Sequence, residues 1–283
     1  MTELVRIERP RSAPVPLVFD SPHSGSIYPD DFDHVIDRMT LRRSEDAYID
    51  QLFGHAPEFG ATLVHALFPR CYIDPNRNED DIDVTMLSGP WPESVNPTSK
   101  TLERGVGLVW KRMRVLGEIY DRQLSPAELS RRIETCWRPY HATLAGILNK
   151  TREAHGVVYH IDCHSMSSRG DAQTEDGPVR RPDFVIGDRD GTTCDKRLTE
   201  CVVETLRAAG HSVAINYPYK GFEIVRRYGR PVDGRHSIQI EVNRGLYMSE
   251  ATLSKSEGFL ATEHTLRKLT QALADFAAGA KTA

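Results

Sequence analysis

The sequence lacks several features that would assign it to a common class. None of its 283 residues form an apolar run long enough to cross a bilayer, and residues 1–10 lack the apolar centre of a signal peptide. The five cysteines form no C-x-x-C pair, which argues against both a thiolate zinc site and a disulfide framework. We therefore expect a cytoplasmic protein with reduced, mostly buried thiols.

An excess of basic charge is also missing. The 36 Lys and Arg residues are spread along the chain and the net charge is −4, so we expect neither a nucleic-acid partner nor a membrane partner. Internal repeats, low-complexity segments and linkers are absent too. A hydrophobic content of 39% is enough for a substantial core. The sequence therefore predicts one domain over residues 1–283 with a small-molecule partner.

Apolar runs alternate with helical patterns along the chain. This order predicts an α/β fold with a mixed, mainly parallel central sheet flanked by helices. The expected helices run from Ser44 to Gly54, from Ser125 to about His155 (as a pair or one broken helix), from Thr192 to Ala209 and from Ser256 to Ala278. The expected strands are Leu17–Phe19, Thr62–Leu67, Cys71–Asp74, Gly107–Trp110, Val157–Ile161, Asp183–Gly187, His211–Ile215 and His236–Asn243, with loops over 75–105, 167–181 and 216–235.

One strand carries an unusual set of polar residues. His160, Asp162 and His164 occupy alternate positions after the apolar residues Val157 and Val158. Alternate side chains of a strand share a face, so these three groups should line up toward its carboxyl end. Ligands bind at that end of the strands in open α/β sheets. We therefore expect the functional site there.

Four pieces of sequence carry metal and acid–base chemistry. His23 follows the first predicted strand, the acids Glu45 and Asp46 begin a predicted helix, His164 ends the central strand, and Glu241 lies in an alternating strand. Two imidazoles and one carboxylate are the ligands of a catalytic zinc ion, and a further carboxylate can serve as general base. The spacing includes no H-E-x-x-H motif. The pattern alone therefore leaves open that His23 is a turn residue and His164 a strand-end histidine.

Five motifs occur in a fixed order over roughly residues 15–270. They are Asp20-Ser-Pro-His-Ser-Gly25, Glu45-Asp-Ala-Tyr-Ile-Asp50, Tyr72-Ile-Asp-Pro-Asn-Arg77, Ile161-Asp-Cys-His-Ser165 and Ile238-Gln-Ile-Glu-Val-Asn-Arg244. In these motifs the chain resembles the N-formylglutamate amidohydrolase family, whose fold resembles that of the zinc carboxypeptidases. The resemblance implies a hydrolase that uses one zinc ion per chain to cleave N-formyl-L-glutamate into formate and L-glutamate, the last step of one route of histidine degradation.

The resemblance also implies roles for individual residues. His23 and His164 are the expected zinc ligands, with Asp46 as the third ligand in preference to Glu45, and Glu241 is the expected general base. A substrate with two carboxylates needs cations, and arginine offers a carboxylate two parallel hydrogen bonds. The expected substrate-binding residues are Asn76, Arg77, Arg244, Tyr72 and His236.

Two other functions remain open at this level. One is the same reaction on another N-acyl amino acid or a small peptide, because Phe222 stands where the family pattern has the second glycine of a pair. The other is a ligand-binding protein of the same fold without catalysis. A general base such as Glu241 has no use in a binding protein, which favours the enzyme.

Overall fold

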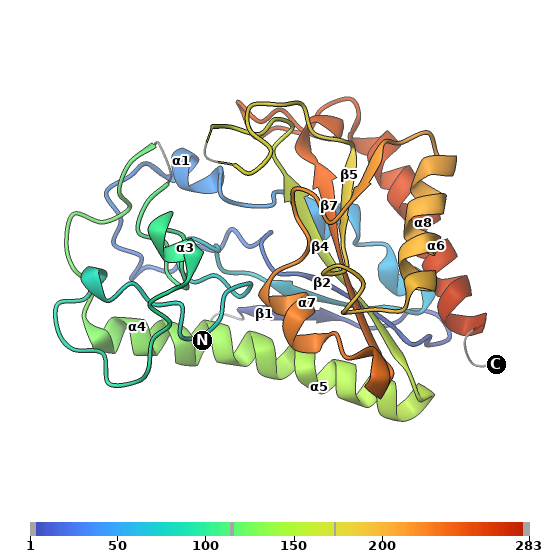
Figure 1. The fold of residues 1–283 in the computed structure, drawn as a ribbon, viewed down its shortest axis with the longest axis horizontal. Coiled ribbons are helices and arrows are strands. Elements are labelled where there is room, and N and C mark those ends of the chain that lie inside the picture. The colour runs from blue at the N-terminus through green and yellow to red at the C-terminus, as the bar shows by residue number, and fades with distance from the viewer. Residues whose placement is uncertain (1–3, 114–115, 173, 280–283) are drawn as a thin grey trace. The chain divides into compact units, whose positions relative to one another are not determined.

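The computed structural model describes residues 4–113, 116–172 and 174–279 (Figure 1). The chain folds into two compact units, each built from several segments. The first unit comprises the described residues within Met1–Arg6, Pro22–Ala47 and His65–Leu144. The second comprises those within Ile7–Ser21, Tyr48–Val64 and Ala145–Ala283. The expectation of one domain over 1–283 stays a prediction.

A mixed seven-stranded sheet, assigned mostly to the second unit, confirms the α/β prediction. Its strand order is β1-β3-β2-β4-β7-β5-β6. β4 is parallel to β2 and β7, whereas β5 is antiparallel to β7 and parallel to β6. The long central strands therefore end at the same edge. The strands are β1 (Val5–Glu8), β2 (Leu17–Ser21), β3 (Thr62–Ala66), β4 (Val158–Met166), β5 (Phe184–Gly187), β6 (Val213–Ile215) and β7 (Arg235–Asn243).

One face of the central strands is apolar and covered by helices. Helix α8 (Phe259–Gly279) packs against β2, α2 (Ile49–Leu52) and α6 (Lys196–Ala208), and α6 and α8 lie side by side (Figure 1). On this face the ring of Tyr159 lies 5.1 Å from that of Phe276 in α8. Ile161 and Cys163 of β4 share this face and are fully buried. Burial of this surface supplies much of the hydrophobic stabilisation of the sheet.

The opposite face of the same strands is polar although it is also buried. Its side chains form hydrogen bonds across three strands: His160 Nε2 contacts Asp20 Oδ1 at 2.9 Å, and His160 Nδ1 contacts Ser237 Oγ at 2.8 Å. Helix α7 (Glu223–Tyr228) packs on β7, and the ring of Tyr228 meets that of His160 edge-on. Buried polar groups are tolerated where they are hydrogen-bonded. Further buried polar residues of this face are Asp162, His164, Gln239, Glu241 and Asn243.

The first unit contains the short helices α1 (Arg38–Arg42), α3 (Lys100–Glu103) and α4 (Pro126–Arg132). Ser125 caps α4 in a reciprocal arrangement with Glu128, as its Ser-Pro-Ala-Glu sequence predicts. A π-helical turn at Ile133–Trp137 joins α4 to α5 (Arg138–His155), which confirms the broken helix expected over Ser125–His155. No helix in the described part of the chain is both long and apolar enough to cross a membrane.

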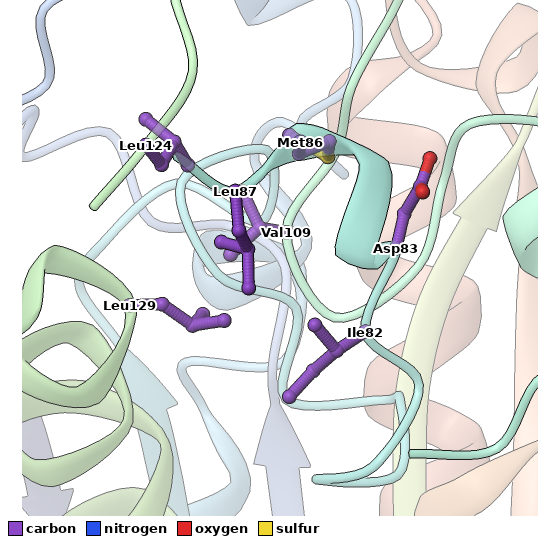
Figure 2. Close-up of a pocket in the computed structure, with 7 residues that line it drawn as sticks. All are labelled: Ile82, Asp83, Met86, Leu87, Val109, Leu124 and Leu129. Carbon is purple, nitrogen blue, oxygen red and sulfur yellow. The ribbon is translucent and has the colours of Figure 1, made fainter. Parts of the chain in front are cut away.

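A small apolar cavity of about 10 Å³ lies within the first unit. Figure 2 shows aliphatic side chains converging on it, whereas the carboxylate of Asp83 points away. A space of this size holds about one water molecule, and its apolar lining offers that water no partner. The cavity is therefore a packing defect and not a substrate site. Its lining residues are Ile82, Asp83, Met86, Leu87, Val109, Leu124 and Leu129.

Several local predictions were wrong. Cys71–Asp74 forms a turn and Gly107–Trp110 forms bends, because both segments wrap around the buried carboxylate of Asp74 instead of pairing with the sheet. The helix expected at Ser44–Gly54 is reduced to α2, since Tyr48 has a left-handed backbone with φ of 68°.

Other helices also differ from the sequence prediction: α3 lies inside the loop predicted over 75–105, and α8 begins at Phe259 rather than Ser256. Helix α6 begins at Lys196 rather than Thr192, because Asp195 caps it by accepting from the amide of Arg197. Helix α7 lies inside the loop predicted over 216–235. The five cysteines are free thiols and four of them are buried, as predicted.

Candidate active site

His23 lies in the first unit, two residues after the end of β2. Its side chain is fully buried between two carboxylates. Nε2 lies 2.7 Å from Asp74 Oδ1, and Nδ1 lies 3.3 Å from Asp46 Oδ2. The backbone fixes this arrangement, because the Asp46 amide donates to the His23 carbonyl and the Ser24 hydroxyl donates to the Asp46 carbonyl. His23 and Asp46 are thus held next to each other.

Asp74 is the centre of a buried charged cluster. Arg70 donates to its Oδ2 through Nε and Nη2 at 3.2 and 3.0 Å, Trp110 Nε1 donates to the same oxygen at 3.2 Å, and Arg77 Nη1 lies 3.7 Å away. Burial works against ionisation here. The cations of Arg70 and Arg77 nevertheless hold the pKa of Asp74 well below its ordinary value. An ionised Asp74 is an acceptor for an N–H at Nε2 of His23.

The two adjacent acids Glu45 and Asp46 have different surroundings. Glu45 accepts hydrogen bonds from the Tyr28 hydroxyl at 2.9 Å and from Arg42 Nε at 3.2 Å. Burial raises the pKa of Glu45, and Arg42 opposes the shift. Asp46 instead faces His23, with Arg70 Nη1 at 3.8 Å from its other oxygen. Glu45 therefore supports the loop, and Asp46 is the acid directed toward His23.

Two of the predicted substrate residues of the first unit, Asn76 and Arg77, adjoin this cluster. Arg77 is largely buried, and it donates to the carbonyls of Val106 and Asn76, each at 2.8 Å. Burial lowers the pKa of Arg77, and Asp74 opposes the shift. The backbone amide of Asn76 donates to Asp74 Oδ1.

Tyr72 has a different environment from Asn76 and Arg77. Its hydroxyl donates to Asp31 at 2.9 Å, and the guanidinium of Arg132 lies over its ring at 4.1 Å. Burial raises the pKa of Tyr72. Its hydroxyl is therefore engaged in the packing of the first unit.

His164 and Glu241 lie in the second unit, at the carboxyl ends of β4 and β7. The two residues are paired in register, and their side chains share the polar face of the sheet. His164 Nε2 lies 2.7 Å from Asp162 Oδ1. Burial raises the pKa of Asp162, and His164 works in the opposite direction. Glu241 accepts a hydrogen bond from Gln239 Nε2 at 2.9 Å.

Arg244 follows β7 at the same end of the sheet. Its Nε donates to Ser165 Oγ at 3.0 Å, and Asn243 begins the 3-10 turn that carries it by accepting from the Gly245 amide. His236 lies elsewhere. It is five residues before Glu241, roughly 17 Å along the strand and on the opposite face. There it stacks on Tyr159 and accepts from the Asp195 amide, so the structure does not bring it to Glu241.

Sequence reasoning assigned no role to Asp74 or Gln239. Asp74 belongs to one of the five sequence motifs, but its partner His23 is 51 residues away. No local sequence pattern reveals such a contact. The only local feature that marks Asp74 in the sequence is its position as an acid between apolar residues and a proline. Gln239 had a similar signal, since an amide alternates there with Ile238 and Ile240 in an otherwise apolar strand.

Each unit thus contains a buried histidine whose Nε2 lies 2.7 Å from a carboxylate oxygen, and the second unit also contains a glutamate at a strand end. Buried imidazoles and carboxylates of this kind are typical of hydrolytic enzymes. The chain belongs to the N-formylglutamate amidohydrolase family, whose model matches residues 15–248.

Individual relatives agree with this assignment. The chain is 32% identical to an N-formylglutamate deformylase of Pseudomonas putida over 92% of both chains. It is 29% identical to that of Pseudomonas aeruginosa, over 96% of this chain and 97% of the relative. It also resembles the crystal structure of N-formylglutamate amidohydrolase from Ralstonia eutropha, with a TM-score of 0.93, 42% identity and coverage of 98% and 99%.

Proposed function

We propose that this protein is a zinc-dependent deformylase that hydrolyses N-formyl-L-glutamate to formate and L-glutamate. The main supporting observation is the pair of histidines, His23 and His164, because the Nε2 atom of each lies 2.7 Å from a buried carboxylate oxygen. The names of the relatives support the substrate. On this proposal the protein acts in the cytoplasm, at the last step of one route of histidine degradation.

The residues present fit a catalytic metal ion. His23, Asp46 and His164 each offer one ligand atom, and all three are buried. Histidines that bind metals commonly donate their other ring N–H to a carboxylate, which fixes the ring and its tautomer. Asp74 and Asp162 are suited to this role, so Nδ1 is the ligand atom of each histidine. Two imidazoles and one carboxylate leave a zinc site with an open position.

The proposed chemistry divides between the ion and the chain. When bound, a divalent ion such as zinc acidifies water and polarises a carbonyl oxygen. Glu241 takes the proton from the water that attacks the formyl carbon. It then delivers that proton to the nitrogen of the departing glutamate, so the C–N bond breaks with charge balanced. Its place at the end of β7, beside His164 in register, supports this role.

On this proposal, two arginines bind the two carboxylates of the substrate. We assign one carboxylate to Arg77 with Asn76 and the other to Arg244, because the guanidinium matches a carboxylate with paired donors. Arg244 is partly exposed and Arg77 is held by backbone carbonyls, so each presents its cation from a fixed position.

The test is formate release from N-formyl-L-glutamate, measured with metal-stripped protein and again after zinc is restored. We expect zinc-dependent turnover on the order of 1–10³ per second. No formate from zinc-loaded protein contradicts the named substrate. A panel of other N-acyl amino acids and small peptides then distinguishes a related specificity from a protein without hydrolase activity.

Substitution E241Q separates the enzyme from a binding protein. The neutral amide cannot accept a proton, so we expect kcat to fall by roughly 10²- to 10⁴-fold while bound zinc per chain is unchanged. S237A is the matched control on the same strand and face, and it should retain the wild-type rate. Undiminished turnover in E241Q contradicts the role of Glu241.

A further inference from the structure

Gln239 is a buried amide whose presence sheet packing does not explain. It lies in the middle of β7, is 3% exposed, and alternates with the apolar residues Ile238 and Ile240 of the opposite face. Its Nε2 donates to Glu241 Oε1 at 2.9 Å, whereas its Oε1 has no hydrogen-bond partner among the described residues. A buried amide oxygen without a partner costs free energy of folding that an apolar side chain of the same size avoids.

In the hydrogen bond between Gln239 and Glu241, the amide is the donor. A carboxylate only accepts, so the amide must present its NH₂ group to Glu241 and its oxygen away from it. Both side chains project from β7, two residues apart. β7 is paired in register with β4 over nine residue pairs. The donor is therefore rigid relative to the carboxylate.

We propose that Gln239 is the positioning residue of the general base. Its amide holds Oε1 of Glu241 and thereby fixes the carboxylate plane, so that Oε2 is the oxygen that exchanges the proton with water and with the leaving amine. The inference rests on the proposed function, since it needs Glu241 to act as base. Gln239 itself touches neither substrate nor metal ion in this scheme.

The geometry also explains why the residue is glutamine. Asparagine at this position is shorter by one methylene, so its amide cannot reach Oε1 at a hydrogen-bond distance. Glutamate has no donor when ionised and adds a like charge beside the base. Methionine matches the length and volume of glutamine but has no donor.

The experiment measures kcat, KM, bound zinc and thermal midpoint for wild type, Q239M, Q239N, E241Q and Q239M/E241Q. We expect Q239M to lower kcat by roughly 10- to 100-fold, as for other residues that orient a catalytic group. KM and zinc content should stay within twofold of wild type, and the thermal midpoint should not fall. Q239N should behave like Q239M, which keeps the test informative if one variant folds poorly.

The double variant supplies a readout that a structural role does not move. If Gln239 acts through Glu241, adding Q239M to E241Q should change the residual rate by less than twofold. If Q239M lowers kcat by the same factor in wild type and in E241Q, or if Q239M alone keeps the wild-type kcat, the inference is overturned and the proposed function remains intact. No turnover in wild type, or undiminished turnover in E241Q, overturns the inference together with the role of Glu241.

Discussion

Nε2 of His23 lies 2.7 Å from Oδ1 of Asp74, a residue 51 positions further along the chain, and both side chains are fully buried. Arg70 and Trp110 occupy the other oxygen of Asp74, so the carboxylate cannot rotate away from the imidazole. The geometry therefore favours a proton on Nε2 of His23, and its Nδ1 lies 3.3 Å from Oδ2 of Asp46.

This relationship predicts that D74N weakens metal binding. An amide at this position accepts less strongly and no longer fixes the tautomer of His23, so we expect zinc affinity to fall roughly 10- to 100-fold. The measurement is a competition titration against a chromogenic chelator. E79Q, which removes an acid paired with Arg138 further along the same segment, is the control and should keep wild-type affinity. Equal affinity in D74N contradicts the role of Asp74.

Asp74 also predicts how stability depends on pH. Its pKa is depressed in the folded protein, so its stabilising contribution is present above the unfolded value near 4 and is lost as pH falls through the folded value. In metal-free protein at pH 7 we expect D74N to lower the free energy of unfolding by about 3–5 kcal/mol, because Arg70 and Arg77 lose their buried partner. Urea titrations at pH 7, 5, 4 and 3 should show this difference shrinking toward acid, and a constant difference contradicts it.

The adjacent acids provide a matched pair of variants. D46N should lose most bound zinc, because it removes the ligand oxygen that faces His23. E45Q should retain zinc, since Glu45 bonds Tyr28 and Arg42 instead, and its effect should be a modest loss of stability. Elemental analysis after dialysis against metal-free buffer gives the zinc content per chain. The reverse result assigns the ligand to Glu45.

Removal of the Arg244 guanidinium tests the substrate assignment. R244A deletes a cation that should pair with one substrate carboxylate, worth about 1.5–3 kcal/mol, so KM should rise roughly 10- to 100-fold. We expect kcat to change much less. R226A removes an arginine that is 52% exposed and bonded to Glu223, and should leave both constants unchanged. A loss in kcat with KM unchanged contradicts a binding role for Arg244.

The central sheet could be predicted because its signal is local. The apolar residues before His160 and the alternation around Glu241 each occupy nine or fewer consecutive residues, and β4 and β7 formed where these patterns lie. The region around Asp74 could not be predicted in the same way. Its backbone follows a buried charge cluster whose members are distant in sequence, and propensity alone suggested strands there.

Local backbone geometry accounts for the other errors. The acids at Glu45 and Asp46 predict the first turn of a helix, but their side chains contact a separate loop and the helix begins after Tyr48. Helix α7 was missed because glycines on both sides of it, Gly221 and Gly229, are typical of loops. For the site, the residue types and the position of Asp162 beside His164 could be read from the sequence, whereas the contact of Asp74 with His23 required the tertiary structure.

The hydrogen bonds among Asp20, His160 and Ser237 have a practical consequence for chemical proteomics. In serine hydrolases, a hydrogen-bonded chain of an acid, an imidazole and a hydroxyl activates the serine that fluorophosphonate reagents label. Here the serine is completely enclosed, so a bulky phosphorus electrophile cannot reach its oxygen in the folded state. The native protein should therefore pass unlabelled through such a screen, and its silence there carries no information about whether it is an active hydrolase.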